Sequence, residues 1–327
     1  VAGSGAQSSA NANFDFAVAR LNDDGSVDTG FGPFGHNGLA LYDVGGAYDN
    51  ATDLGFHGAS PVLLGSSTRV GQAKSELSVL KLTAGGLADA AFGTAGAAFV
   101  AAAGSLNAGR MAVLADGKVV VSSTSRLLAR LTAAGALDAA FGTAGVQQET
   151  EPSLLSYSTL LPGGDGTIMA IASRYLYAPQ YTTDAALVRY TATGTRDGSF
   201  GASGIASANL FTMSLDARAV AIGPTGKVHV AGTLSDAHDI DAAVVRLTPG
   251  GAVDGFGAAG VAAVALGATD EIANALVVLG DGSVVLAGRS VNGGTGSFLL
   301  SKFTDSGQPV GSFGNIGKRI HTMGIGY

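Results

Sequence analysis

The chain has 327 residues, and its 18 Lys and Arg stand against 25 Asp and Glu, a formal net charge of −7 at pH 7. This balance argues against a nucleic-acid partner, which requires a clustered excess of basic residues to neutralise phosphates. Mean hydropathy is +0.33, but polar residues and glycine interrupt every apolar run before the roughly 18 residues of a membrane span. Glycine supplies 51 residues without the triplet period of collagen, and the absence of cysteine excludes a zinc–thiolate site.

One motif recurs six times along the chain: an apolar strand ending in Arg or Lys, a turn, and then, in most copies, an Asp before Phe-Gly. The first copy reads FAVARLNDDGSVDTGFG from Phe16, and the fifth reads AAVVRLTPGGAVDGFG from Ala242. The basic residues of the copies lie 49 to 61 residues apart at Arg20, Lys81, Arg130, Arg189, Arg246 and Lys302. A repeat of this period indicates an array of similar structural units.

Two further apolar runs joined by a Gly turn lie between the motifs, as in MAVLADGKVVVSS from Met111. Such turns are typical of β-hairpins, because Gly supplies the positive φ that they need. With a fourth short strand after each Phe-Gly, every repeat has the make-up of a propeller blade. The sequence therefore predicts an all-β, six-bladed β-propeller of four-stranded antiparallel blades, forming one domain over residues 1–327. The third strands, which carry the basic residues, are expected near 16–21, 77–82, 127–131, 186–190, 242–247 and 298–303.

The repeat resembles the bacterial delta-60 repeat, in which a hairpin with Pro-Asp-Gly-Lys at its turn precedes Phe-Ala-Leu-Ala-Arg-Leu, Asp and Phe-Gly. The resemblance covers almost the whole chain. Departures from the pattern are Val310 in place of the Asp, Lys81 and Lys302 in place of Arg, and a hairpin turn at 57–60 without Asp-Gly. The resemblance implies a secreted or surface protein of bacteria and implies no particular activity.

An aspartate stands eight residues after the basic residue in five of the six copies. Because the same pair recurs in successive blades, we expect it to tie the third strand to the following loop by charge-assisted hydrogen bonds rather than to act as acid and base. These structural residues include Arg20 with Asp28, Arg130 with Asp138, Arg189 with Asp197 and Arg246 with Asp254. The phenylalanines of the Phe-Gly pairs are expected to anchor the same loops in the core.

The alternation of antiparallel strands separates two faces of the propeller. One face is formed by the hairpin turns and the loops after the third strands, and it is nearly constant between repeats. The other face, here called the variable face, is formed by the connections from second to third strand and from fourth strand to the next first strand. Rigid scaffolds carry function on such loops. Its acidic residues outnumber its basic ones, and we expect a solvated acidic rim there rather than a dedicated site; the acids include Asp43, Asp49, Glu76, Glu149, Glu151, Asp270 and Glu271.

Two segments of the variable face are rich in side chains that could bind a metal ion or a ligand. In SDAHDID, Asp236, His238, Asp239 and Asp241 lie within six residues, and the three carboxylates are candidate calcium ligands, although the EF-hand pattern is missing. The longest connection, SRYLYAPQYTTD, carries Tyr175, Tyr177 and Tyr181, which are suited to contact a protein or a glycan. Arg289 completes the set of candidate binding residues. The alternative for the tyrosines is that they cover the edge of their own blade.

Catalysis is not favoured, because the sequence contains no Gly-x-Ser-x-Gly elbow and no strand–Gly–helix phosphate loop. The candidates for catalysis are His238 with Asp239, and His321. We therefore expect a secreted or cell-surface, non-catalytic scaffold that binds a protein or glycan through its variable face, without a membrane span. The chain begins at Val1 without a basic and apolar leader, so we expect any signal peptide to have been removed. An extracellular hydrolase or lyase acting on the same face remains the alternative.

One blade is expected to be incomplete. The opening residues VAGSG match the end of a second strand, and GKRIHTMGIGY supplies a last fourth strand, so one first strand is missing. The strand could come from residues before Val1 or from the tail at 323–327, closing one blade with both termini. It could also come from a neighbouring molecule, which would give self-association or a surface fibre.

Overall fold

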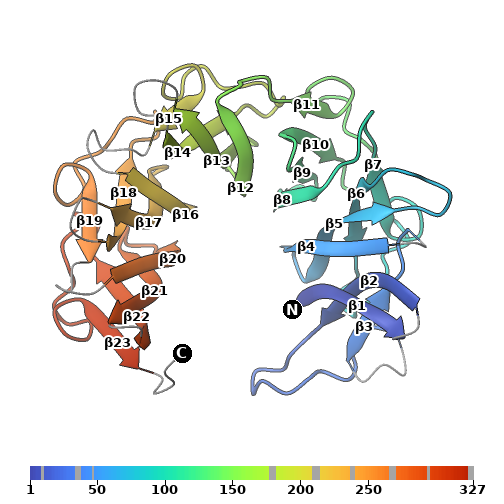
Figure 1. Cartoon of the computed structure of the whole chain (residues 1–327), viewed down its shortest axis with the longest axis horizontal. Helices are drawn as coiled ribbons and strands as arrows, with labels where there is room; N and C mark the ends of the chain where they lie inside the picture. Colours follow the sequence, from blue (N-terminus) through green and yellow to red (C-terminus); the bar gives the residue numbers. More distant parts are fainter. Residues whose placement is uncertain are drawn as a thin grey trace. The chain divides into compact units, whose positions relative to one another are not determined.

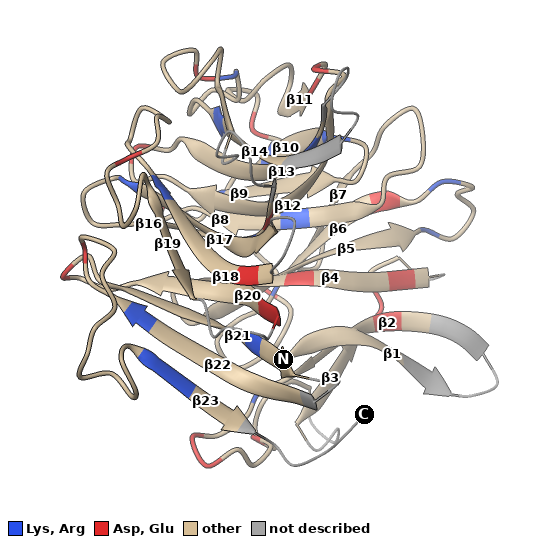
Figure 2. Ribbon diagram, turned by 60° about the vertical axis from the view of Figure 1, so that its left-hand side comes forward, with Lys and Arg blue, Asp and Glu red and all other residues tan. Residues whose placement is uncertain are grey.

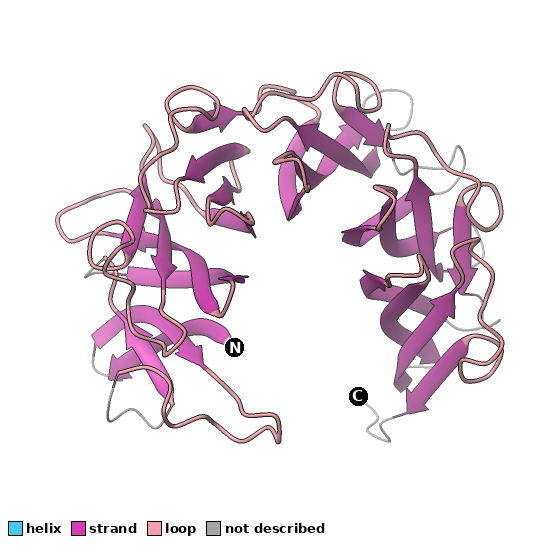
Figure 3. Cartoon of the chain, turned by 180° about the vertical axis from the view of Figure 1, so that it is seen from behind, coloured by secondary structure: helices cyan, strands magenta, loops and turns pink. Residues whose placement is uncertain are grey.

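The computed structural model of the chain describes residues 1–8, 11–33, 38–45, 48–176, 182–207, 214–235, 240–264, 270–292 and 295–322. This part of the chain forms 23 β-strands joined by turns and loops (Figure 3). Within the same ranges, no helix is long and apolar enough to cross a membrane.

The chain divides into two compact units, Val1–Ile168 with Thr191–Thr195, and Met169–Tyr190 with Arg196–Tyr327. Unit 1 contains three antiparallel sheets in chain order (Figure 1). Sheet 1 consists of β1 (Ala2–Ser8), β2 (Asn11–Ala19) and β3 (Leu39–Tyr42). Sheet 2 consists of β4 (Tyr48–His57), β5 (Ser60–Thr68), β6 (Glu76–Lys81) and β7 (Ala97–Val100). Sheet 3 consists of β8 (Ala108–Val113), β9 (Val119–Ser123), β10 (Leu127–Leu131) and β11 (Val146–Gln148).

Unit 2 contains two complete sheets of the same kind. Sheet 5 consists of β16 (Ser214–Ile222), β17 (Val228–Ser235), β18 (Ile240–Leu247) and β19 (Val261–Val264). Sheet 6 consists of β20 (Asp270–Val278), β21 (Val284–Asn292), β22 (Thr295–Phe303) and β23 (Lys318–Thr322). The boundary between the units falls in sheet 4, which has the strand order β12 (Leu154–Pro162), β13 (Ile168–Leu176), β14 (Thr182–Tyr190) and β15 (Ile205–Ser207).

Consecutive strands are neighbours in every sheet, as in the blades of a β-propeller. The predicted all-β class and the six antiparallel blades are confirmed. Sheet 1 has three strands, and its β1 occupies the position of a second strand. Val18 of β2 and Val79 of β6 are equivalent residues, each two positions before the basic residue of its repeat. Val18 pairs with Ala2 of β1, and Val79 pairs with Leu64 of β5, which is the second strand of sheet 2. The tail expected to complete this blade, residues 323–327, lies outside the described residues.

The third strands follow the prediction closely in sheets 2, 3 and 5. In the other sheets the ladder begins several residues earlier, at Asn11 of β2, Thr182 of β14 and Thr295 of β22. Polar residues and glycine extend these strands, because the ladder is made of backbone hydrogen bonds that do not depend on apolar side chains. In sheet 6, for example, Gly296 lies opposite Val291.

The hydrophobic core lies between successive sheets. Val62 and Leu77 of sheet 2 belong to one buried cluster with Val119 and Leu131 of sheet 3. Phe16 of sheet 1 packs in a second cluster with side chains of sheet 2. Each sheet is therefore stabilised through its neighbours rather than alone.

The first strands of sheets 2, 5 and 6 contain a bulge that explains a repeated glycine. In sheet 2 Ala51 is opposite Gly65 while Asp53 is opposite Leu64, so Thr52 is an extra residue. The bulge brings the carbonyl oxygen of Asn50 so close to Gly65 that a Cβ there would overlap it. Sheets 5 and 6 repeat the same register shift opposite Gly232 and Gly288.

The bulge predicts opposite outcomes for two glycines at the same position of neighbouring sheets. Gly65→Ala is expected to lower the free energy of unfolding by about 1 to 3 kcal/mol, because the new Cβ displaces backbone. Gly3, which has nothing within 4 Å of its would-be Cβ, is the control. Its change to Ala should be neutral or stabilising by a few tenths of a kcal/mol or more, since alanine restricts the unfolded chain. Urea unfolding of both variants measures the difference, and equal effects would contradict this account.

Candidate functional site

The basic residue, the aspartate and the phenylalanine of each repeat form one contact set. In sheet 3, Arg130 Nε donates to Asp138 Oδ2 at 2.8 Å, and the guanidinium lies over the ring of Phe141, 4.8 Å from its centroid. A second guanidinium nitrogen donates to the carbonyl oxygen of Ala192, in the turn at 191–195 that belongs to the same unit. One side chain thus joins its own loop to the turn of the following repeat; we call this arrangement the interblade latch.

The ion pair and the ring contact recur in both units, and Arg20, Arg189 and Arg246 also donate to a carbonyl oxygen of the following repeat. The ion-pair distances are 2.7 Å for Arg20 and Asp28, 3.2 Å for Lys81 and Asp89, 2.7 Å for Arg189 and Asp197, and 3.1 Å for Arg246 and Asp254. The cations lie 4.8, 5.9, 4.8 and 4.6 Å from the ring centroids of Phe31, Phe92, Phe200 and Phe256, in the same order. These rings are buried, whereas Phe313 of the last repeat is half-buried.

Backbone hydrogen bonds complete each latch. The N–H of Gly142, which follows Phe141, donates to the carbonyl oxygen of Thr193 at 2.7 Å. In that turn Gly194 has φ of +84°, and a Cβ there would lie 2.8 Å from the ring of Phe141. The repeated glycines after the basic residues therefore permit close approach of one repeat to the next.

The latch aspartates are held ionised, so they are poor candidates for proton transfer. The hydrogen bond from Arg20 is the main cause of the lowered pKa of Asp28. Burial raises the pKa of Asp138, but the N–H of Ala140 and the charge of Arg130 outweigh it, and the pKa is lowered overall.

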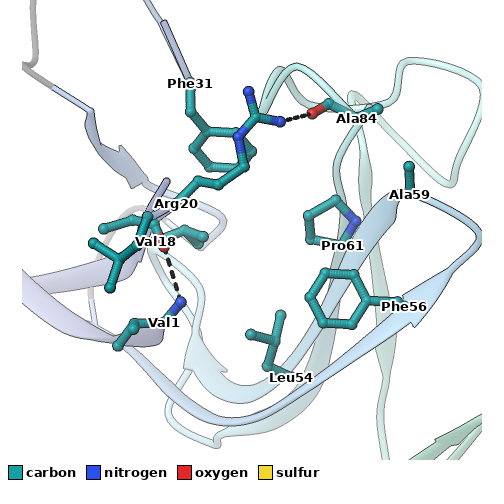
Figure 4. A pocket seen from close by; sticks show the side chains of 11 residues that line it. Val1, Val18, Arg20, Phe31, Leu54, Phe56, Ala59, Pro61 and Ala84 are labelled. Atoms are coloured by element: carbon teal, nitrogen blue, oxygen red, sulfur yellow. Dashed lines mark hydrogen bonds between the residues drawn. The ribbon is translucent and has the colours of Figure 1, made fainter. Parts of the chain in front are cut away.

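An apolar hollow of about 230 Å³ adjoins the latch between sheets 1 and 2 (Figure 4). Its walls include Val18, Leu54, Phe56 and Pro61, with the guanidinium of Arg20 donating to the carbonyl oxygen of Ala84 at its rim. The hollow faces the constant loops. We assign it to the latch rather than to ligand binding.

His229 of β17 is a packed strand residue. It is 2% exposed, and its ring meets that of Phe256 edge to face, with 5.9 Å between centroids. Both ring nitrogens are buried, and within the described part of the chain neither has a hydrogen-bond partner. Burial, followed by the charge of Arg246, lowers the pKa of His229 to about 4.

The structure describes only some of the residues expected to bind or catalyse. Tyr177, Tyr181, Asp236, His238 and Asp239 lie outside the described residues, so the predicted calcium site and catalytic pair remain predictions.

Four expected site residues are described. Tyr175 of β13 and Asp241 of β18 are half-buried, and Arg289 of β21 and His321 of β23 are exposed. Arg289 and His321 lie opposite Phe298 of β22 from its two sides. Sheet 6 therefore places these two side chains in one row across the sheet.

The sequence predicts a solvated acidic rim on the variable face, and the structure bears this out for Asp43 and Asp270, which are exposed, but not for four other acids. Asp49 is 1% exposed, Glu76 8%, Glu149 3% and Glu271 0%. Glu76 Oε1 accepts a hydrogen bond from Arg69, and Glu149 Oε1 accepts the N–H groups of Thr150 and Glu151. The prediction is wrong for these four acids, because they lie at or next to strand ends where hydrogen bonds from neighbouring groups compensate for their burial. Figure 2 shows acidic positions on the adjacent strands β2 and β4.

A polar groove of about 390 Å³ lies on the variable face between sheets 2 and 3. Hydroxyl and amide groups dominate its walls, which consist of Tyr48, Asn50, Thr52, Ser66, Thr68, Ser75, Asn107 and Ala108. Tyr48 is 47% exposed and stacks edge to face on Phe14, 5.5 Å between centroids. Ser66 Oγ accepts the N–H of Ala108, which fixes the two sheets on either side of the groove.

Sequence reasoning missed this groove, since single hydroxyl residues in strands carry no distinctive signal. It also missed Asp15, although a signal existed. An acid stands five residues before the basic residue in several repeats, as Asp15 does before Arg20, Glu76 before Lys81 and Asp241 before Arg246.

The sequence matches the family described as "Domain of unknown function (DUF5122) beta-propeller" over residues 1–31 and 114–141. The match supports a β-propeller repeat family. No curated protein matches the sequence.

Solved structures similar to the chain include several propellers. The WD40 β-propeller domain of Doa1 has 10% identity and a TM-score of 0.41, over 80% of this chain and 68% of that one. A glucose dehydrogenase has 13% identity and a TM-score of 0.44, over 86% and 91%. The polysaccharide lyase PL25, an ulvan lyase, has 10% identity and a TM-score of 0.49, over 90% and 76%. No conclusion about ligands or chemistry follows from likenesses at this level.

The contacts of the latch predict that replacing its arginine by lysine lowers the free energy of unfolding. Arg130→Lys should lower the free energy of unfolding by about 1 to 2 kcal/mol, because the ammonium cannot serve Asp138, Ala192 and the Phe141 ring together. The reciprocal change Lys81→Arg in sheet 2 should stabilise, and urea unfolding measures both. A neutral Arg130→Lys would show that the bond between repeats adds nothing.

His229 predicts a loss of stability in mild acid. Its pKa is lower in the folded state, so protons bind the unfolded chain preferentially as the pH falls from about 6.5 toward 4. The loss should reach about 3 kcal/mol near pH 4 and should be absent from His229→Phe, which keeps a ring against Phe256. Urea unfolding across this pH range tests it, with the exposed His321→Gln as the control. A wild-type slope retained in His229→Phe would assign the effect to other groups.

Proposed function

We propose that the protein is a non-catalytic binding module that takes a glycan in the polar groove of its variable face. The observation that carries the proposal is the lining of the groove, where an exposed tyrosine ring stands among hydroxyl and amide groups. Sugars present both apolar C–H faces and hydroxyl groups, so an aromatic face with neighbouring hydrogen-bonding groups suits them.

The chemistry of the groove favours binding over catalysis. Among the described lining residues, Tyr48 carries the only ionisable group, and the others offer neutral donors and acceptors. General acid–base catalysis needs a positioned group that exchanges protons near the working pH. The half-buried hydrogen bond to Ser66 Oγ and the hydrogen bond from Ser4 Oγ to Asn50 Oδ1 hold the walls in place before a ligand arrives, which limits the entropy lost on binding.

The setting of this activity follows from the repeat. We assign the chain to the bacterial delta-60 repeat proteins and propose that it acts outside the cell or on its surface, where polysaccharides are accessible. The motif of Arg or Lys, Asp and Phe-Gly supports this assignment, and the match to a propeller repeat family agrees with it.

A glycan array probed with the full chain tests the proposal. Tyr48→Ala and Asn107→Ala should each weaken binding to any glycan found by about tenfold or more, the loss expected for a contact at the centre of an interface. Tyr175→Ala, which changes a tyrosine of β13 that does not line the groove, is the matched control and should bind as the wild type does.

Two results would contradict the proposal. Binding lost in Tyr175→Ala and kept in Tyr48→Ala would move the site to the tyrosine-bearing connection of sheet 4. Release of shorter or unsaturated fragments from a bound polysaccharide would show an enzyme instead of a binding module.

A further inference from the structure

Three carboxylates from separate elements meet at the variable face of unit 1. Asp15 lies in β2, Asp43 follows β3 directly, and Asp49 is the second residue of β4. One oxygen from each lies within 4.8 Å of the others. Two of the three side chains are buried, Asp15 at 3% and Asp49 at 1% exposure. Like charges repel at this separation, and burial removes the water that would screen them.

Asp49 is fixed by the connection that leads into its strand. Its Oδ2 accepts the N–H of Val44 at 2.8 Å and that of Gly45 at 3.1 Å. Its Oδ1 is buried, and no group among the described residues forms a hydrogen bond with it. A buried carboxylate oxygen without a partner is costly, so this atom is a candidate ligand for a cation.

The equivalent acid of sheet 6 shows how a carboxylate at this position is otherwise satisfied. Glu271 lies opposite Ser290 as Asp49 lies opposite Ser67. Ser290 Oγ donates to Glu271 Oε1 at 3.2 Å. In sheet 2, however, Ser67 Oγ donates to Ser78 Oγ at 2.7 Å, so the hydroxyl that would serve Asp49 is engaged elsewhere.

A glycine keeps space beside the unpartnered oxygen. A Cβ on Gly45 would lie 2.7 Å from Asp49 Oδ1. Gly45 is not among the residues with positive φ, so its backbone does not require glycine. Glycine at this position therefore leaves free the space next to the Asp49 carboxylate, which a larger side chain would fill.

We propose that Asp15, Asp43 and Asp49 bind a calcium ion. Carboxylate oxygens are the ligands that calcium prefers, and calcium holds them at about 2.4 Å in flexible geometry. Two oxygens on one such ion lie at most about 4.8 Å apart, so a single ion spans the cluster. The charge of the ion removes the repulsion and gives Asp49 Oδ1 its partner.

The ion joins sheet 1 to sheet 2 at the face opposite the latch. It also fixes the start of β4, where Asp49 lies between Tyr48 and Asn50, two residues that line the groove. The calcium proposal does not rest on the proposed glycan binding, and its test needs no glycan.

Calorimetry of the full chain, stripped with EDTA and titrated with CaCl2, is the direct test. We expect one calcium ion per chain and an affinity lowered about tenfold or more in Asp43→Asn and Asp49→Asn, because each loses a charged ligand. Glu271→Gln removes the equivalent buried acid of sheet 6 and should bind calcium as the wild type does. Absence of binding to the wild type, or equal binding by the aspartate variants, would overturn the proposal.

Thermal unfolding separates an ion ligand from a structural carboxylate. Asparagine at 49 keeps an oxygen for the N–H groups of Val44 and Gly45, so Asp49→Asn should fold. Without calcium its Tm should equal or exceed that of the wild type, and only the wild type should gain Tm with millimolar CaCl2. A variant that is less stable than the wild type in EDTA would assign Asp49 a structural role only. Binding of Mg²⁺ without Ca²⁺ would overturn the choice of ion.

Discussion

The contact on which this fold depends is that of an arginine, in four of the six repeats, with three partners at once. The guanidinium of Arg130 pairs with Asp138, covers the ring of Phe141 and donates to the carbonyl oxygen of Ala192 in the next repeat. A four-stranded sheet of this size cannot bury its own apolar faces, so it is stable only against its neighbours. The latch fixes the distance and angle at which those faces meet.

The two faces therefore have different roles: the constant face carries the contacts between repeats, and the variable face carries the candidate binding sites. On the constant face, the loops after the third strands are committed to the latch, and glycines such as Gly194 allow the loops to approach closely. The variable face has no such repeated task. Its residues are consequently free to differ between repeats, and the polar groove and the three carboxylates of unit 1 both lie there.

The repeat made the fold predictable from sequence. Six spaced copies of one motif predicted the sheets, the third strands and the pairing of residues such as Arg20 with Asp28 in contact. The sites were less predictable, because they are formed across repeats. Tyr48 and Asn107 meet at one groove from segments far apart in sequence, and no local pattern connects them. The burial of Asp49 depends on the connection at 43–48, whose path cannot be read from composition.

The bulge near the start of β4 links the two sites that we propose. Asp49 lies directly before the bulged segment and Thr52, the extra residue, lies in the groove wall. A bulge changes the direction of side chains that follow it and increases local twist. A cation on Asp49 would hold the N-terminal end of β4, while the hydrogen bond from Ser4 Oγ to Asn50 holds the next residue against sheet 1. The position of Tyr48 then depends on both anchors, so calcium and a ligand in the groove are expected to favour one another's binding, as linkage requires for two sites that order the same strand.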